Sequence, residues 1–154
     1  EHTIFLILGD HGAPSGHTYE MPLSYHHIPL IVHCPSLIKP DTLYQLGYQP
    51  DVMPTLLSLL NVSYNNSGFG QNLFNLQRDY VFFTADDKAG LLTKDGYYFI
   101  KFLNQQKRGL YRFRGLDSTN LVSTNARLAD SLEKKLDALL LTSGFVLHRD
   151  YYLR

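Results

Sequence analysis

The 154-residue sequence predicts a mixed α/β fold, in which buried strands come first and an antiparallel meander and a final helix follow. Continuous apolar runs at 3–8 and 28–32 are typical of strands that are buried on both faces of a parallel sheet. Short aromatic-rich segments that alternate with turn residues begin at Tyr80. Leucines then recur at helical spacing between residues 125 and 141.

The composition indicates a folded domain and excludes several classes of partner. Hydrophobic residues make up 44% of the chain and charged residues 18%, which is typical of globular domains rather than disordered chains. Fourteen basic residues balance fourteen acidic ones, so the basic surface of a nucleic-acid-binding protein is absent. Because no run reaches the ~18 apolar residues of a membrane-spanning helix, we expect no span in this chain.

The two N-terminal strands suggest that the chain belongs to a larger whole. The first apolar run starts two residues after Glu1, although chain termini are usually exposed. We therefore expect this chain to be the C-terminal piece of a longer protein.

The second run has Pro29 near its start, where a missing N–H group is tolerated.

A helix is predicted over residues 51–60. Asp51 is a suitable N-cap, Pro54 falls in the first turn, and Asn61 is a plausible left-handed stop. Four side chains form one apolar face: Val52, Leu56, Leu59 and Leu60.

The C-terminal half predicts a small sheet followed by a helix. Strands are expected at 80–85, 90–93, 97–103 and 110–113, with a hairpin turn at Asp95-Gly96. The helix is expected over 125–141, with Asp130 paired to Lys134 and Gly144 as its terminator.

Two polar residues directly after the first strand are the strongest candidates for chemistry. Asp10 and His11 are flanked by glycines, which allow a sharp turn and the close approach of a ligand. A carboxylate and an imidazole are good ligands for a divalent metal, and ligands bind at the carboxyl ends of strands in open α/β sheets. On the residues alone, a turn-capping Asp beside an exposed His is the alternative.

The remaining histidines and the single cysteine give weaker signals. His17 lies in a polar loop, where it either contacts an anionic substrate or is simply exposed. His26 and His27 are neighbours before the second strand, where they would point to opposite sides and not bind one metal. Cys34 is interpreted as a small buried residue. The sequence contains no G-x-S-x-G elbow, P-loop or strand-linked G-x-G-x-x-G motif.

The order of these motifs resembles the C-terminal part of the alkaline phosphatase superfamily. It runs from Gly9-Asp10-His11-Gly12 through the strand at 28–32 and the helix at 51–60 to Gly70-Gln71-Asn72-Leu73-Phe74. The chain is most similar to the sulfatase-like branch that includes lipoteichoic acid synthases and phosphoglycerol or phosphoethanolamine transferases. This resemblance implies the C-terminal portion of an alkaline-phosphatase-like parallel-sheet sandwich over 1–78 and an α+β subdomain over 79–154.

The resemblance also implies a divalent metal (Mn, Mg, Zn or Ca) with Asp10 and His11 among its ligands, and a substrate contact at His17. In this family a Thr, Ser or modified Cys attacks a phosphorus or sulfur ester, and the metal activates that nucleophile. The nucleophile lies upstream of the Asp-His pair in the family. We therefore expect no catalytic nucleophile here, an inactive isolated chain, and the missing N-terminal part as its partner.

These implications predict a fragment of a metal-dependent phosphoester transferase or hydrolase at the extracytoplasmic face of a bacterial membrane. A sulfatase that acts on sulfate esters is one alternative. A non-catalytic binding or assembly domain is the other.

Overall fold

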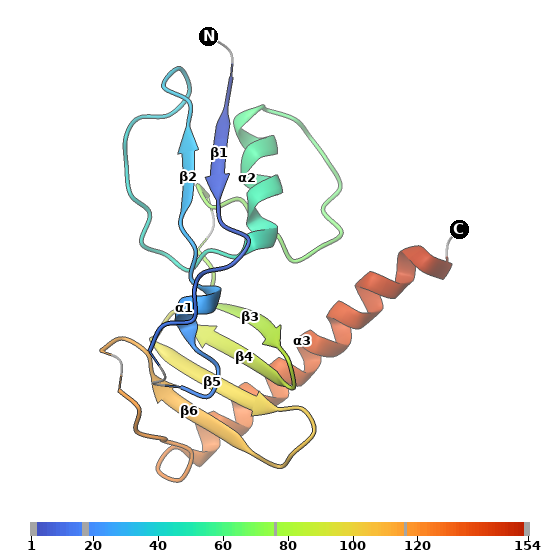
Figure 1. Cartoon of the computed structure of the whole chain (residues 1–154). Coiled ribbons are helices and arrows are strands. Elements are labelled where there is room, and N and C mark those ends of the chain that lie inside the picture. Colours follow the sequence, from blue (N-terminus) through green and yellow to red (C-terminus); the bar gives the residue numbers. More distant parts are fainter. Residues whose placement is uncertain (1–2, 17–18, 76, 116, 153–154) are drawn as a thin grey trace. The chain divides into compact units, whose positions relative to one another are not determined.

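The computed structural model describes residues 3–16, 19–75, 77–115 and 117–152, and Figure 1 labels their helices and strands. The chain divides into two compact units, Glu1–Tyr44 and Gln45–Arg154. The sequence predicts a domain boundary after residue 78, and this position lies inside the second unit. The division into a catalytic part over 1–78 and a subdomain over 79–154 stays a prediction.

The first unit contains a two-stranded antiparallel ladder of β1 (Phe5–Leu8) and β2 (Leu30–His33). A short helix, α1 (Leu23–His26), lies between these strands in the sequence. The expectation of parallel, doubly buried strands is corrected here, since Phe5 pairs with His33 and three apolar side chains are exposed: Phe5, Ile7 and Ile31. An apolar run fixes neither the direction of the neighbouring strand nor which face stays uncovered.

The second unit is built on a four-stranded antiparallel sheet in the order β3-β4-β5-β6, which confirms the predicted meander. The strands are β3 (Tyr80–Ala85), β4 (Lys88–Thr93), β5 (Tyr97–Phe102) and β6 (Arg108–Arg112). Gly96 turns the chain between β4 and β5 at a φ of +87°, which costs glycine little. The hairpin turn at Asp95-Gly96 is therefore confirmed.

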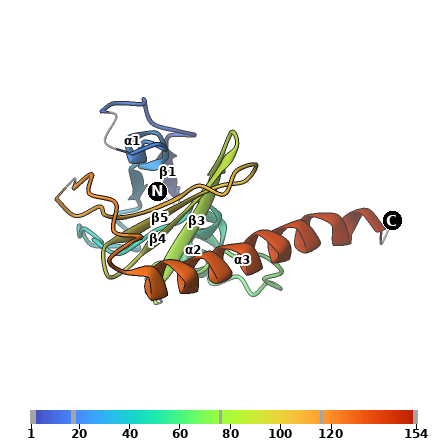
Figure 2. The ribbon, with the colours of Figure 1, turned by 90° about the horizontal axis from the view of Figure 1, so that it is seen from below.

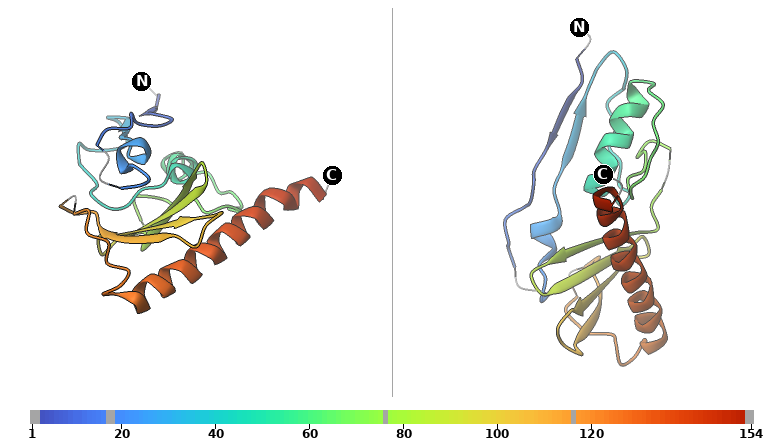
Figure 3. Two further views of the ribbon diagram at one scale, coloured as in Figure 1. Left: turned by 60° about the horizontal axis from the view of Figure 1, so that its bottom comes forward. Right: turned by 90° about the vertical axis from the view of Figure 1, so that its right-hand side faces the viewer.

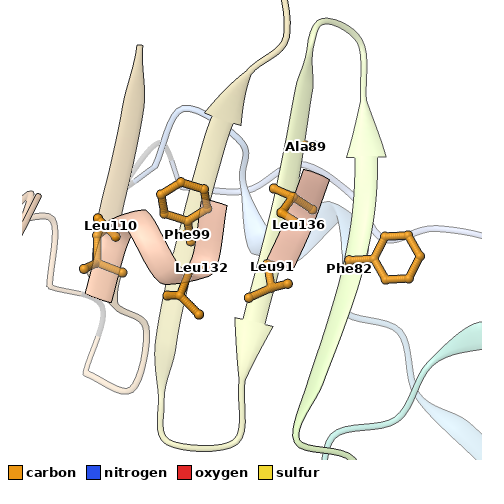
Figure 4. Close-up of a cluster of buried hydrophobic side chains, with 8 residues drawn as sticks. Phe82, Ala89, Leu91, Phe99, Leu110, Leu132 and Leu136 are labelled. Carbon is orange, nitrogen blue, oxygen red and sulfur yellow. The ribbon is translucent and has the colours of Figure 1, made fainter. Parts of the chain in front are cut away.

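Helix α3 (Ala126–Tyr152) lies along one face of this sheet, as Figure 2 shows, and its C-terminal part extends beyond the strands in both views of Figure 3. The core between sheet and helix appears in Figure 4. Its buried side chains are Phe82, Ala89, Leu91, Phe99, Leu110, Ala129, Leu132 and Leu136. The mixed α/β class with a meander and a C-terminal helix is thus confirmed.

The predicted end of the last helix is wrong, because α3 continues through Gly144 to Tyr152. A glycine ends a helix when it adopts positive φ, and Gly144 is not among the positive-φ glycines of the described residues. We expected Asp130 to pair with Lys134, but its Oδ1 atom lies 2.8 Å from Nη2 of Arg108 in β6. Its charge therefore ties the helix to the sheet.

Among the described helices, none combines the length and apolar character needed to cross a membrane.

Asp51 is fully buried and joins three separate stretches of the second unit. Its carboxylate accepts hydrogen bonds from the backbone N–H of Tyr48 at 2.8 Å and of Gln71 at 2.7 Å. Arg78 donates to it from Nε at 2.8 Å and from Nη2. Asp51 is the N-cap residue of α2 (Val52–Leu59), as predicted, but its carboxylate makes no capping hydrogen bond to this helix. It closes the preceding turn, η1 (Gln49–Asp51), instead.

The predicted apolar face of α2 is partly buried, with Val52, Leu56 and Leu59 at intermediate exposure. The buried residues of this helix are Pro54 and Thr55, whereas Leu60 beyond its end is half exposed. Thr55 is held inside because its hydroxyl donates to the Asp51 carbonyl at 2.7 Å and accepts from the Leu73 N–H at 3.1 Å. Asn61 does adopt positive φ at +52°, as expected of a left-handed stop.

The core predicts a sharp contrast between two leucines of α3. Leu136→Ala should lower the free energy of unfolding by about 2–5 kcal/mol, because Leu136 is fully buried against the sheet. Leu141→Ala, at a position that is 77% exposed, should change it by less than ~0.5 kcal/mol. Urea denaturation measures both values, and equal losses would contradict the packing described here.

The buried ion pair predicts a second large effect. Asp51→Asn should lower the free energy of unfolding by about 3–5 kcal/mol, since it leaves the Arg78 guanidinium buried without its counter-charge. Asp79→Asn is the matched control, because that carboxylate pairs with Lys94 at 2.7 Å on the exposed surface. Thermal denaturation should show a loss in the first variant and almost none in the second.

Candidate functional site

The two predicted metal ligands lie in the turn that follows β1, on the surface of the first unit. The Asp10 side chain is 91% exposed and the His11 side chain 55% exposed. Asp10 Oδ1 accepts a hydrogen bond from the His11 N–H at 2.9 Å, and Asp10 Oδ2 lies 3.9 Å from His11 Nε2. The turn thus brings one carboxylate oxygen and one imidazole nitrogen close together in solvent.

Local hydrogen bonding favours the charged form of the Asp10 carboxylate. The N–H of His11 donates to it, and this bond lowers the pKa of Asp10 below its usual value. Asp10 is therefore ionised at neutral pH, which is the form that binds a cation.

The His11 ring is held in a defined orientation. Its Nδ1 lies 2.9 Å from the Gly12 carbonyl oxygen, which can only accept, so Nδ1 carries the proton. The ring stacks on Tyr25 at 4.8 Å between centroids and 19° between planes. In this tautomer Nε2 keeps its lone pair, as a metal-binding histidine requires.

Two backbone segments meet at Gly12 and hold this turn in place. The Gly12 N–H donates to the Tyr25 carbonyl at 2.8 Å. Further along, Ser24 Oγ accepts from the Ser15 N–H at 2.8 Å and donates to the Ser15 carbonyl at 2.9 Å. A Cβ atom at position 12 would lie 2.1 Å from the Ser24 carbonyl oxygen, so only glycine allows this approach.

Within the part of the chain that the structure describes, no other residue singled out in the sequence joins this pair in a group that could hold a metal ion. His17 lies outside the described residues. His26 ends α1 and packs edge-on against Tyr25 at 5.3 Å between ring centroids, and burial lowers its pKa. Cys34 is buried, as expected, with its Sγ 3.4 Å from Ser36 Oγ.

The donor set fits two positions of a divalent metal site. An ionised carboxylate and a neutral imidazole are ligands that Zn²⁺ and Mn²⁺ accept in proteins. Among the described residues, no three His, Cys, Asp or Glu side chains come together in a way that could hold a metal ion. Asp10 and His11 therefore form a two-donor group.

The orienting contacts of this group are what the sequence did not show. Tyr25, Ser15 and Ser24 belong to no recognisable motif. The sequence therefore gives no sign that Tyr25 stacks on His11 or that Ser24 bonds to Ser15. The clue available in the sequence was the glycine at position 12, which signals a close backbone approach but does not identify its partner.

Comparison with known proteins identifies a structural likeness. No protein-family model matches the chain. Among solved structures it is similar to BT4656, determined in complex with its substrate D-glucosamine-2-N,6-O-disulfate, with a TM-score of 0.58 and 20% sequence identity. The match covers 80% of this chain and 29% of that protein, so the chain spans less than a third of its neighbour. The chain therefore has a sulfatase-like fold over the matched part.

The close contact at Gly12 predicts a local effect. Gly12→Ala should force Ser24 away and weaken the hydrogen bond to the Tyr25 carbonyl, so the amide at position 12 should exchange with solvent at least about tenfold faster. Gly68→Ala is the control, because the nearest atom to a Cβ there is 3.9 Å away. Hydrogen exchange followed by NMR tests this, and unchanged protection in Gly12→Ala would contradict the geometry.

Proposed function

We propose that this chain is part of a metal-dependent enzyme of the sulfatase-like superfamily that transfers or hydrolyses phosphate esters, and that it supplies Asp10 and His11 to the metal site. One observation carries the proposal. The Gly12 carbonyl fixes the His11 proton on Nδ1, and His11 Nε2 lies 3.9 Å from a charged carboxylate.

The two residues would act by binding and orienting. Asp10 contributes a negative charge that its own turn keeps ionised, and His11 contributes a lone pair whose direction is set by Gly12 and Tyr25. A divalent metal bound in such a site supplies Lewis acidity toward an ester oxygen. The identity of the metal, Mn, Mg, Zn or Ca, is left open by a donor set of one carboxylate and one imidazole.

The proposal includes a partner, the N-terminal part of the same protein. We expect the catalytic nucleophile and the remaining metal ligands there, and we expect the isolated chain to be inactive. Two observations support this partner: the chain spans 29% of BT4656, and Phe5, Ile7 and Ile31 are exposed on the β1–β2 ladder. We also propose His17 as a substrate contact and the extracytoplasmic face of a bacterial membrane as the location, both on the resemblance alone.

A sulfatase is the second candidate, favoured by the sulfated sugar bound to BT4656. Phosphate and sulfate esters present similar tetrahedral centres, so the Asp10–His11 pair suits either. Assay of the complete protein with matched phosphate and sulfate monoesters separates the two enzymes. Absence of turnover of either ester by the complete protein would instead favour a binding or assembly domain.

The metal assignment predicts a local response to Mn²⁺. Titration of the chain with Mn²⁺ should broaden the NMR signals of residues 9–12 and 25 before others, because they surround the two donors. Asp10→Asn and His11→Ala should each weaken the Mn²⁺ affinity by at least about tenfold, since each removes one of two ligands.

His33→Ala is the matched control, because His33 is an exposed histidine of the same unit that lies beside Phe5 at 6.2 Å between ring centroids. It should keep the full response to Mn²⁺. Equal broadening in His11→Ala and His33→Ala would contradict the metal assignment.

A further inference from the structure

A second feature that could bind a ligand is a cleft of about 410 Å³ in the Gln45–Arg154 unit. It lies between α2 and the loop that follows this helix. The helix contributes Pro54 and Ser58, and the loop contributes five residues: Asn61, Val62, Ser63, Tyr64 and Asn72. A volume of this size lies in the range of about 300–1,000 Å³ that small-ligand sites occupy.

The lining of the cleft is uncharged. None of the residues that line the cleft in the described part of the chain carries a charge. Hydroxyl groups and carboxamides provide both donors and acceptors, and Tyr64 adds an aromatic ring next to the apolar side chains of Pro54 and Val62. An anion would find no opposite charge in such a cleft, and a wholly apolar ligand would desolvate its hydroxyls and amides without replacing their hydrogen bonds.

The walls of the cleft are held by hydrogen bonds. The loop is fastened to the end of α2 by the Asn61 N–H, which donates to the Ser58 carbonyl at 3.1 Å, and by the Val62 N–H, which donates to the Leu57 carbonyl at 2.9 Å. Asn61 has a φ of +52°, which turns the chain sharply at this point. The loop therefore starts from a fixed position on the helix.

The polar groups are oriented as well. Asn72 Nδ2 donates to Ser58 Oγ at 2.7 Å, while Asn72 Oδ1 accepts from the Phe74 N–H at 3.0 Å. These two bonds set the direction of the carboxamide. Ser58 accepts one of them, so its hydroxyl proton is left for another acceptor. Pre-arranged polar groups lose little conformational entropy when a ligand binds.

We propose that this cleft binds an uncharged saccharide unit. Sugars match its chemistry because they carry many hydroxyl groups, no charge, and one face of C–H groups that packs against an aromatic ring. Tyr64, which is 42% exposed, would supply this ring. Ser58, Ser63 and Asn72 would exchange hydrogen bonds with the sugar hydroxyls. The proposal is independent of the metal assignment, because Asp10 and His11 belong to the other unit.

The test is an NMR titration of the chain with N-acetylglucosamine and with glucose, with sodium sulfate as the anionic comparison. We expect amide shifts at residues 58, 61–64 and 72 with at least one of the sugars, with a dissociation constant of millimolar order. Tyr64→Ala should weaken binding about tenfold, because it removes the stacking surface. Tyr44→Ala should leave binding unchanged, because Tyr44 is an exposed tyrosine that does not line the cleft.

A second pair of variants decides the question if Tyr64→Ala does not fold. Ser63→Ala should weaken sugar binding severalfold, and Ser67→Ala, at an exposed serine of the same loop outside the cleft, should not. Shifts at the cleft with sulfate but with neither sugar would overturn the proposal, as would the absence of any shift at 50 mM sugar, about fifty times a millimolar constant. Sugar-induced shifts that persist unchanged in Tyr64→Ala and Ser63→Ala would overturn it too.

Discussion

The arrangement of the Gln45–Arg154 unit depends on the buried ion pair between Asp51 and Arg78. Removing two charges from water costs several kcal/mol per ion unless hydrogen bonds replace the lost hydration. Here the backbone N–H groups of Tyr48 and Gln71 saturate the carboxylate, and the guanidinium also donates to the Phe69 carbonyl at 2.5 Å. The guanidinium carbon of Arg78 lies 5.3 Å from the centroid of the Tyr48 ring. Burial raises the pKa of Tyr48; the positive charge of Arg78 opposes this shift, and the negative charge of Asp51 adds to it. The pair therefore joins η1, the 60–75 loop and the entry to β3.

The same polar centre connects α2 to the sheet. The rings of Tyr48 and Phe69 pack on Phe82 of β3, at 5.6 Å and 5.2 Å between centroids. Gly70 passes so close to the start of α2 that a Cβ atom there would lie 2.2 Å from the Pro50 carbonyl oxygen. Charge pairing, aromatic packing and a glycine contact thus fix the C-terminal end of the loop that forms one wall of the uncharged cleft. Asp51 does not line that cleft, but its hydrogen bond from the Gln71 N–H holds the residue next to Asn72, which does.

The features that the sequence predicted correctly are those that local chemistry determines. The four strands from Tyr80 onward and the turn at Gly96 follow from aromatic alternation and one dipeptide. The direction of β1 relative to β2 and the role of Asp51 depend on partners far along the chain; Arg78 is 27 positions from Asp51. For the candidate site, the position after the first strand and then the resemblance pointed to Asp10 and His11, and their metal role stays a prediction. The stacking of His11 on Tyr25 has no local signal, because only the folded chain brings the two rings together.

Two aspartates of this protein show why burial and hydrogen bonding distinguish a structural group from a candidate ligand. Asp51 is fully buried, and both of its oxygens accept from backbone N–H groups and from Arg78, so it has no capacity left for a ligand. Asp10 is almost fully exposed, and the hydrogen bond from the His11 N–H engages Oδ1 while Oδ2 lies beside His11 Nε2. Water stabilises the charge of the exposed Asp10 carboxylate, whereas removal of Arg78 would leave the Asp51 charge unpaired inside the protein. The first carboxylate therefore maintains the fold, and the second is available for chemistry at the surface.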